Sequence, residues 1–147
     1  MAGGSGVEWY FGSKFPHMDI NCEDWRSRDH MWDQTRHALQ FFHAYLPFVE
    51  MHANNSLTSS TSDFCFAKPG EVYAVYLPDG GTTQLKLPAG AYAVRWYDPR
   101  SGGVLQLGTV ARMTGPGNRA IGMPPADPQD DWVALVCKPA WLDKHGR

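Results

Sequence analysis

Cysteine is scarce in this sequence, and the scarcity excludes two classes of small domain. Cys22, Cys65 and Cys137 are widely separated and odd in number. This pattern fits neither a disulfide framework nor the paired spacing of a zinc knuckle. We therefore interpret all three cysteines as free thiols.

Basic residues are not in excess, and long apolar runs are missing. The 13 Lys and Arg residues face 15 Asp and Glu residues, for a formal net charge of -2. Recognition of a phosphate backbone needs a basic surface, so nucleic acid is excluded as a partner. No apolar run approaches the ~20 residues of a membrane span, which excludes a membrane partner. The segment from Met1 to Gly12 also lacks the basic start and continuous apolar core of a secretion signal.

The longest periodic stretch runs from Asn21 to Phe48 and predicts one amphipathic helix with a wide apolar arc. Asn21 is the expected N-cap, and Pro47 ends the helix. An arc this wide needs two partner surfaces. We expect its heptad-spaced stripe to dock on the β region that follows. The predicted docking residues are Trp25, Trp32, Leu39, Phe42 and Leu46.

Beyond the helix, the apolar period changes to two, with turn residues every eight to twelve positions. This pattern predicts a mainly β fold, an antiparallel β-sandwich over residues 64–138 with the long helix docked on it. Residues 1–50 hold that helix and a short strand-like run before it. Residues 51–63, rich in Asn, Ser and Thr, are predicted to be a linker, and residues 139–147 a frayed tail.

Seven strands are expected in the β region, separated by turns that include residues 88–90 and 115–117. They are Phe64–Lys68, Glu71–Leu77, Thr82–Leu87, Ala91–Asp98, Val104–Val110, Arg119–Met123 and Trp132–Cys137. The expected core residues are Tyr73, Val75, Leu85, Val94, Trp96, Leu105, Val133 and Leu135. On the strand from Ala91, Arg95 and Tyr97 point away from Trp96. These two residues are the candidates for ligand binding on an exposed sheet face.

Histidines and acidic residues do not form a recognisable metal motif. His30, His37 and His43 lack the i, i+4 spacing of a helical zinc pair, so we interpret them as solvated helix residues. The acidic group at Asp127, Asp130 and Asp131 fits either a calcium loop or a short polar turn before a strand. No phosphate-cradling loop or nucleophile elbow is present. The sequence predicts no metal and no cofactor.

Several aromatic-rich runs carry a resemblance to a known family. They are GVEWYFG, CEDWRSRDHMWDQTRHALQFF, KPGEVYAVYLP, RWYDPRSGG and DWVALV, in this order. Together they resemble the C-terminal part of apiosidase-like glycoside hydrolases. In that family a (β/α)8 barrel is followed by a β-sandwich described as a putative collagen-binding domain of a collagenase. The resemblance covers nearly the whole chain.

The resemblance implies that residues 6–12 match the last barrel strand and the long helix matches the last barrel helix. Seven of the eight βα units of the family are then missing, so we expect the barrel to be the partner. The helix face that should meet the barrel is bare in this chain, and self-association is expected. The parent implied by the resemblance is secreted or periplasmic.

The expected function is a noncatalytic accessory domain that packs on the barrel and stabilises it. Glu8 and Asp19 would lie at the catalytic face, but a lone strand and helix cannot build a glycosidase site, so no catalytic residue is predicted. Trp9, Tyr10 and His17 either line a sugar subsite of the complete barrel or pack in a core. The alternative function is a free-standing module that binds carbohydrate or a collagen-like ligand.

Overall fold

The computed structural model describes residues 24–146, without the side chain of Trp25, and the single residues Gly6, Glu8, Tyr10, Gly12 and Met18. One antiparallel sheet of six strands forms the body, in the order β1-β2-β3-β6-β4-β5. The strands are β1 (His52–Ala53), β2 (Phe64–Lys68), β3 (Val72–Leu77), β4 (Gln84–Tyr97), β5 (Arg112–Ala120) and β6 (Trp132–Cys137). The helices are α1 (Asp29–Tyr45) and α2 (Pro139–His145), with 3-10 turns η1 (Trp25–Arg28), η2 (Phe48–Glu50) and η3 (Asn55–Leu57). The predicted mainly β fold with one long N-terminal helix is confirmed.

The two layers of the predicted sandwich belong to one continuous sheet, because β4 runs through both. Residues 84–93 of β4 pair with β5, with a register shift between Leu87 and Gly90, and its last five residues pair with β6. The turns expected at residues 88–90 and 115–117 are therefore wrong. Both segments lie inside strands, where a Cβ on Gly115 would clash with the carbonyl oxygen of Pro88. Glycine here allows close strand approach rather than chain reversal.

Two apolar cores lie on the two faces of the sheet. The inner core is enclosed by the bend of β4, and the outer core lies under the helices. The inner core contains Cys65, Tyr73, Val75, Leu85, Tyr92, Val94, Trp96, Trp132 and their neighbours. The outer core contains Phe41, Tyr45, Leu46, Met51, Val72, Ala74, Tyr97, Val133, Leu135 and Cys137. Strands β3 and β6 contribute to both, which explains why their sequences are apolar on both faces. All the predicted core residues are buried except Leu105, which is half-buried at the outer core.

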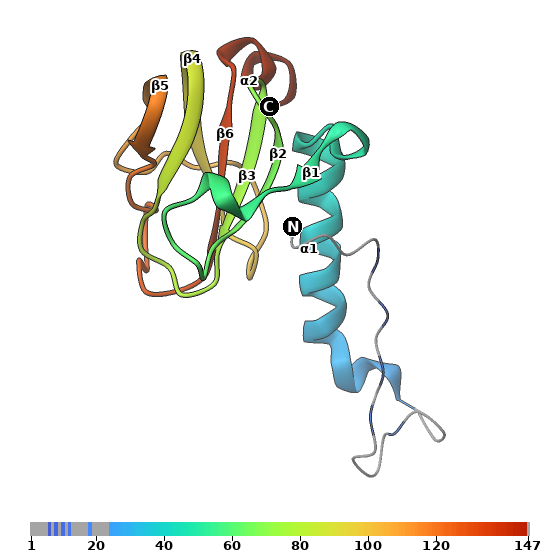
Figure 1. The fold of residues 1–147 in the computed structure, drawn as a ribbon. Helices are drawn as coiled ribbons and strands as arrows, with labels where there is room; N and C mark the ends of the chain where they lie inside the picture. The colour runs from blue at the N-terminus through green and yellow to red at the C-terminus, as the bar shows by residue number, and fades with distance from the viewer. Residues whose placement is uncertain are drawn as a thin grey trace.

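Helix α1 lies against the outer face of the sheet, and its N-terminal part projects past the edge of the β domain (Figure 1). The helix begins at Asp29, later than predicted, after the 3-10 turn η1. Asp24 caps that turn, accepting a hydrogen bond from the Arg26 backbone N–H at 3.1 Å. The predicted cap, Asn21, lies outside the described residues. The helix ends at Tyr45, two residues before Pro47, as the missing N–H of proline requires.

The segment predicted as a linker is part of the β domain. Strand β1 pairs with β2, and Ser59 donates its backbone N–H to the carbonyl of Gln84 at 3.0 Å. Polar residues are needed here because their side chains hold the chain against the edges of β2 and β4. One example is the Asn55 side chain, which accepts a hydrogen bond from the Cys65 backbone N–H at 2.9 Å.

The predicted tail is also ordered, as helix α2. Its Trp141 donates the indole N–H to the carbonyl of Tyr45 at 2.9 Å, so α2 is fixed to the end of α1. The strand expected at Val104–Val110 is reduced to a single bridge between Gln106 and Trp96. Of the strand expected at Arg119–Met123, only Arg119 and Ala120 lie in a strand, at the end of β5. Among the described residues, no helix has the length and apolarity that crossing a bilayer requires.

Candidate functional site

The contact between α1 and the sheet is built around Phe41. This side chain is 2% exposed, and its ring centroid lies 4.8 Å from that of Tyr97 on β4 and 5.6 Å from that of Tyr45. The Tyr97 hydroxyl donates a hydrogen bond to the carbonyl of His37, at 2.9 Å. Burial raises the pKa of Tyr97 above its ordinary value. The interface therefore joins an aromatic cluster to one buried hydrogen bond.

His37 is buried at this interface, and its interpretation as a solvated residue is wrong. The ring packs against the loop after β4, where a Cβ on Gly102 would come within 2.6 Å of the imidazole Cδ2. Glycine at that position leaves room for the ring, and its positive φ of 69° suits a residue without a Cβ. His30 and His43 are exposed, as expected.

The predicted docking stripe is divided between buried and exposed positions. Leu39 is 55% exposed, because two residues at ~100° each place it about 200° from Phe41. Trp32, a heptad before Leu39, is half-buried. Phe42 and Leu46 pack at the outer core, and the Trp25 side chain lies outside the described residues.

Three large apolar side chains on α1 and just after it remain exposed. We call Leu39, Phe48 and Val49 the outer strip; Leu39 lies on α1, whereas Phe48 and Val49 lie in η2, and Val49 is 84% exposed. Phe48 lies beside the helix end, with its ring centroid 6.2 Å from that of Phe42. The sheet thus covers the Phe41 side of the helix and leaves Leu39 exposed.

A groove of about 470 Å³ opens between α1 and strands β2 and β3. Its walls combine aromatic rings with a polar end. The helix side is formed by Gln34, Ala38 and Phe42, the sheet side by Phe64 and Tyr76, and the polar end by Arg100 and Asp131. Phe64 and Tyr76 are paired across β2 and β3, and their ring planes are inclined by only 24° at a centroid distance of 6.4 Å. The two rings are stacked with nearly parallel planes, and we call this pair the Phe64–Tyr76 platform.

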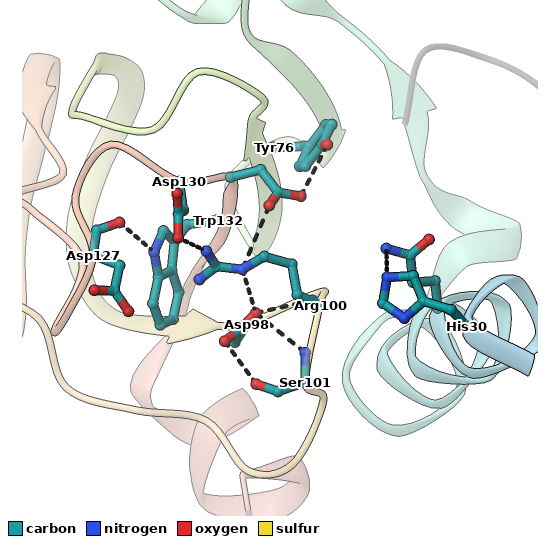
Figure 2. Close-up of polar contacts among 10 residues, drawn as sticks. His30, Tyr76, Asp98, Arg100, Ser101, Asp127, Asp130 and Trp132 are labelled. Carbon is teal, nitrogen blue, oxygen red and sulfur yellow. Dashed lines mark hydrogen bonds and ion pairs between the residues drawn. The ribbon is translucent and has the colours of Figure 1, made fainter.

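The polar end of the groove is organised by the guanidinium of Arg100 (Figure 2). It donates from Nε to Asp98 at 3.0 Å, pairs with Asp130, and lies 3.6 Å from Asp131. Its Cζ also lies 5.5 Å from the ring centroid of Trp132, in a cation–π contact. Figure 2 also shows His30 on α1, where its imidazole Nε2 lies 3.2 Å from the side-chain amide of Gln34.

The loop after β4 holds Arg100 in place through its own hydrogen bonds. The Asp98 carboxylate accepts from the Arg100 backbone N–H at 2.9 Å and from the Ser101 hydroxyl at 2.7 Å. Burial raises the pKa of Asp98, but hydrogen bonds from Arg100 and Ser101 outweigh it and hold the pKa below its ordinary value. The Tyr76 hydroxyl donates to Asp131 at 3.1 Å. Burial, followed by the Asp131 charge, raises the pKa of Tyr76 to about 12.

The acidic group considered for calcium lies around this arginine. Asp130 and Asp131 are both paired with Arg100, and Asp127 presents its backbone carbonyl to the Trp132 indole N–H at 3.3 Å. A guanidinium among these carboxylates supplies the positive charge that a cation would supply. In the part of the chain that the structure describes, no group of three or more His, Cys, Asp or Glu side chains is placed to hold a metal.

The ligand-binding residues expected from the sequence do not come together. Tyr97 is 2% exposed, so the prediction of an exposed Tyr97 is wrong: α1 covers that face of the sheet. Arg95 is half-buried, and its guanidinium donates to the backbone carbonyl of Val94 at 2.7 Å. Tyr10 is exposed, whereas Trp9 and His17 lie outside the described residues.

Sequence reasoning missed the groove because its walls come from five separate segments of the chain. Phe64 and Tyr76 become neighbours only through the register of β2 and β3. The alternation of β2 places Phe64 on the same face as Phe66, which a pairing of the two strands could have connected to Tyr76. Arg100 had a visible signal in the Asp-Pro-Arg-Ser-Gly-Gly turn, but its pairing with the two aspartates just before β6 had none.

Comparison with known proteins finds a matching family and solved structures with a similar fold. The model of the family described as "Putative collagen-binding domain of a collagenase" matches residues 49–137. A solved structure named "Glycoside hydrolase" superposes with a TM-score of 0.65 at 13% identity, covering 88% of this chain and 31% of its own. A glycoside hydrolase family 5 structure from Bacteroides vulgatus ATCC 8482 gives a TM-score of 0.65 at 16% identity, covering 88% and 29%. Among curated proteins, none matches the chain.

The extent of these superpositions is informative about the helix. The chain spans less than a third of the length of either solved structure. The family match ends at residue 137 and begins at residue 49, so an alignment over 88% of the chain must extend into the residues before 49. The shared fold therefore includes more than the β domain.

Proposed function

The chain belongs to the family described as the putative collagen-binding domain of a collagenase, and on this basis we propose that it is a noncatalytic accessory domain. In this proposal it packs on the barrel of a glycoside-hydrolase-like protein and stabilises that barrel. The contact is made by α1, which would lie between the barrel and the β domain.

This proposal rests on one observation: the apolar side chains on one side of α1 are buried against the sheet, whereas Leu39 on the other side is exposed. Phe41 is 2% exposed against the sheet, whereas Leu39 is 55% exposed on the opposite side. Val49 extends the outer strip beyond the helix end. Contiguous apolar surface on a soluble domain generally marks an interaction site. Figure 1 shows that the N-terminal part of α1 also projects past the β domain, where a second body can reach it.

A barrel is the occupant that the comparisons favour. Both solved chains are named as glycoside hydrolases, and more than two thirds of each lies outside the part that superposes on this chain. The superposed part includes residues before 49, which supports a recurrence of the helix together with the β domain. A barrel helix must be apolar toward the barrel, and a helix shared with a second domain must be apolar on both sides.

A noncatalytic role is supported by the protonation chemistry of the groove. Glycoside hydrolysis needs one carboxyl group with a raised pKa as general acid and a second as nucleophile or base. Asp98 has the opposite shift, because hydrogen bonds from Arg100 and Ser101 overcome the effect of burial on its pKa. Asp130 and Asp131 are paired with the same guanidinium. These carboxylates are arranged to hold an arginine.

Sedimentation velocity tests the proposed role of the outer strip. Without a barrel the strip lies bare, so we expect the chain to self-associate at micromolar concentration. Leu39→Glu combined with Val49→Glu should abolish this association. Val104→Glu is the matched control, since Val104 is exposed on the loop after β4 and outside the strip. A wild-type chain that stays monomeric, or a control that dissociates equally, would contradict the proposal.

Two further measurements separate docking from catalysis. In a protein that has a barrel ahead of this segment, amide exchange around Leu39 should be slower than in the chain alone. The chain alone should release no sugar from aryl glycosides or plant polysaccharides. Release by purified protein that Glu8→Gln abolishes would overturn the noncatalytic assignment.

A further inference from the structure

We propose that the groove between α1 and strands β2 and β3 is a binding site for a neutral oligosaccharide, one or two sugar rings in length. The site lies in this chain alone, so it does not depend on the barrel contact proposed above. It uses the Phe64–Tyr76 platform as its apolar surface and the Arg100 end as its polar surface.

The platform presents aromatic surface to the groove, and aromatic surface suits a sugar ring. Phe64 and Tyr76 are half-buried, with ring planes 24° apart, and both line the groove. The face of an aromatic ring carries negative charge density, which attracts the weakly positive C–H groups on the flat side of a sugar. Ala38 stands on the helix wall of the same groove, where its small side chain leaves the space open.

The polar end supplies hydrogen-bond partners of the right kind. A carboxylate accepts hydrogen bonds at about four positions and donates none. The Asp131 carboxylate receives the Tyr76 hydroxyl and the nearby Arg100 guanidinium, so it retains acceptor capacity. Asp130 is exposed at the same end. A ligand that fits must therefore donate hydrogen bonds, and sugar hydroxyls donate as well as accept.

The charge and the hydrogen-bonding groups at the polar end of the groove favour a sugar over two other ligand classes. One guanidinium, Arg100, is paired with three carboxylates at this end, which leaves an excess of negative charge. That excess disfavours uronates, phosphates and other anions. A collagen-like chain is rich in proline, which has no backbone N–H, so its main donors are the hydroxyproline hydroxyls, about one for every three residues. Its backbone carbonyls would gain nothing from facing the acceptors of Asp130 and Asp131, whereas a sugar has a hydroxyl on most ring carbons.

The size of the groove agrees with a short ligand. Its volume of about 470 Å³ lies within the range of small-molecule sites, ~300 to 1,000 Å³. The aromatic and polar surfaces meet at Tyr76, whose ring belongs to the platform and whose hydroxyl contacts Asp131. A single sugar ring on Tyr76 can therefore stack and hydrogen-bond at the same time.

Titration of the isotope-labelled chain, followed by amide NMR, tests this proposal directly. The neutral probes are xylotriose, cellotriose and mannotriose. Trigalacturonate is the anionic probe, and a triple-helical peptide of Pro-Hyp-Gly repeats is the peptide probe. We expect at least one neutral trisaccharide to shift the amides of Tyr76 and Arg100, with millimolar or tighter affinity, and the other two probes to leave them unchanged.

Variants locate the site. Phe64→Ala removes half of the platform and should weaken sugar binding by about tenfold or more. Asp131→Asn keeps the platform and removes one acceptor oxygen, so it should also weaken sugar binding. This variant tests the site if Phe64→Ala fails to fold. Tyr10→Ala is the matched aromatic deletion at an exposed position and should have no effect.

Three results would overturn the assignment. The first is that none of the three neutral trisaccharides shifts the groove amides at about 20 mM, a concentration that would detect even weak binding. The second is that the shifts map elsewhere and survive Asp131→Asn. The third is that the peptide or the uronate occupies the groove and the neutral sugars do not.

Discussion

The hydroxyl of Tyr97 donates a hydrogen bond to the backbone carbonyl of His37 across 2.9 Å, and so joins the end of β4 to the middle of α1. Both residues are buried, and their neighbours Phe41 and Tyr45 complete the contact. Within the described chain, this bond fixes the position of α1 along the sheet. The aromatic contacts around it would allow the helix to slide along the sheet, whereas a hydrogen bond requires one donor–acceptor geometry.

Tyr97→Phe should therefore destabilise the chain by about 0.5 to 1.5 kcal/mol, the usual net contribution of one buried hydrogen bond. Urea unfolding measures this difference. Tyr45→Phe is the control in the same cluster, since the described residues offer its hydroxyl no hydrogen bond. Equal losses from both substitutions would show that the Tyr97 hydroxyl has no special role.

Arg100→Gln should destabilise the chain by about 1 to 3 kcal/mol at neutral pH, because it leaves three carboxylates without their counter-ion. The depressed pKa of Asp98 gives this loss a pH dependence. Its stabilisation is present above its ordinary pKa of 3.8 and is lost as the pH falls through the lower folded value. The difference between wild type and variant should thus shrink below about pH 4.

Unfolding curves of both proteins from pH 2 to pH 7 test this dependence. Arg36→Gln is the matched control, because the Arg36–Asp33 pair is exposed on both sides and should cost much less. If the difference in unfolding free energy between wild type and Arg100→Gln stayed constant across the whole pH range, the electrostatic explanation would be wrong. Lost packing of Arg100 on Trp132 would then explain the destabilisation.

Alkaline pH should destabilise the chain through the thiols of Cys65 and Cys137, both buried in the described part of the chain. Burial raises the pKa of Cys65 and of Cys137 to about 12, from an ordinary value of 9.0. Between these values the unfolded state loses the thiol proton and the folded state keeps it. The free energy of unfolding must therefore fall as pH rises from 9 towards 12. Cys65→Ala combined with Cys137→Ala should make this fall less steep, whatever its cost at pH 7. An unchanged slope would contradict the effect.

The mainly β fold and the long helix were predictable because both follow from local periodicity. Strands Phe64–Lys68 and Trp132–Cys137 are observed at their predicted bounds, and the helix ends where Pro47 requires. The bend of β4 was not predictable, because Pro88 and Gly90 are typical of turns and here lie in a strand with shifted register. That outcome depends on β5, where Gly115 permits the close approach.

The docking face of α1 shows the same limit. A helix that is apolar on two sides has no local feature that decides which side meets the sheet. The choice of Phe41 over Leu39 depends on Tyr97, and Tyr97 faces the helix only because β4 and β6 pair in the observed register. His37 was misassigned for the same reason: a polar side chain is buried when a glycine on a distant loop makes room for it.

The central claim is that α1 has two apolar sides and that the β domain covers only one. Urea unfolding of Phe41→Ala and Leu39→Ala in the isolated chain tests it most directly. Phe41→Ala should cost about 3 to 5 kcal/mol, as for a buried aromatic side chain, while Leu39→Ala should stay within about 0.5 kcal/mol of wild type. If Leu39→Ala proved as destabilising as Phe41→Ala, the outer strip would already be covered within this chain. The helix would then have no free side for a barrel.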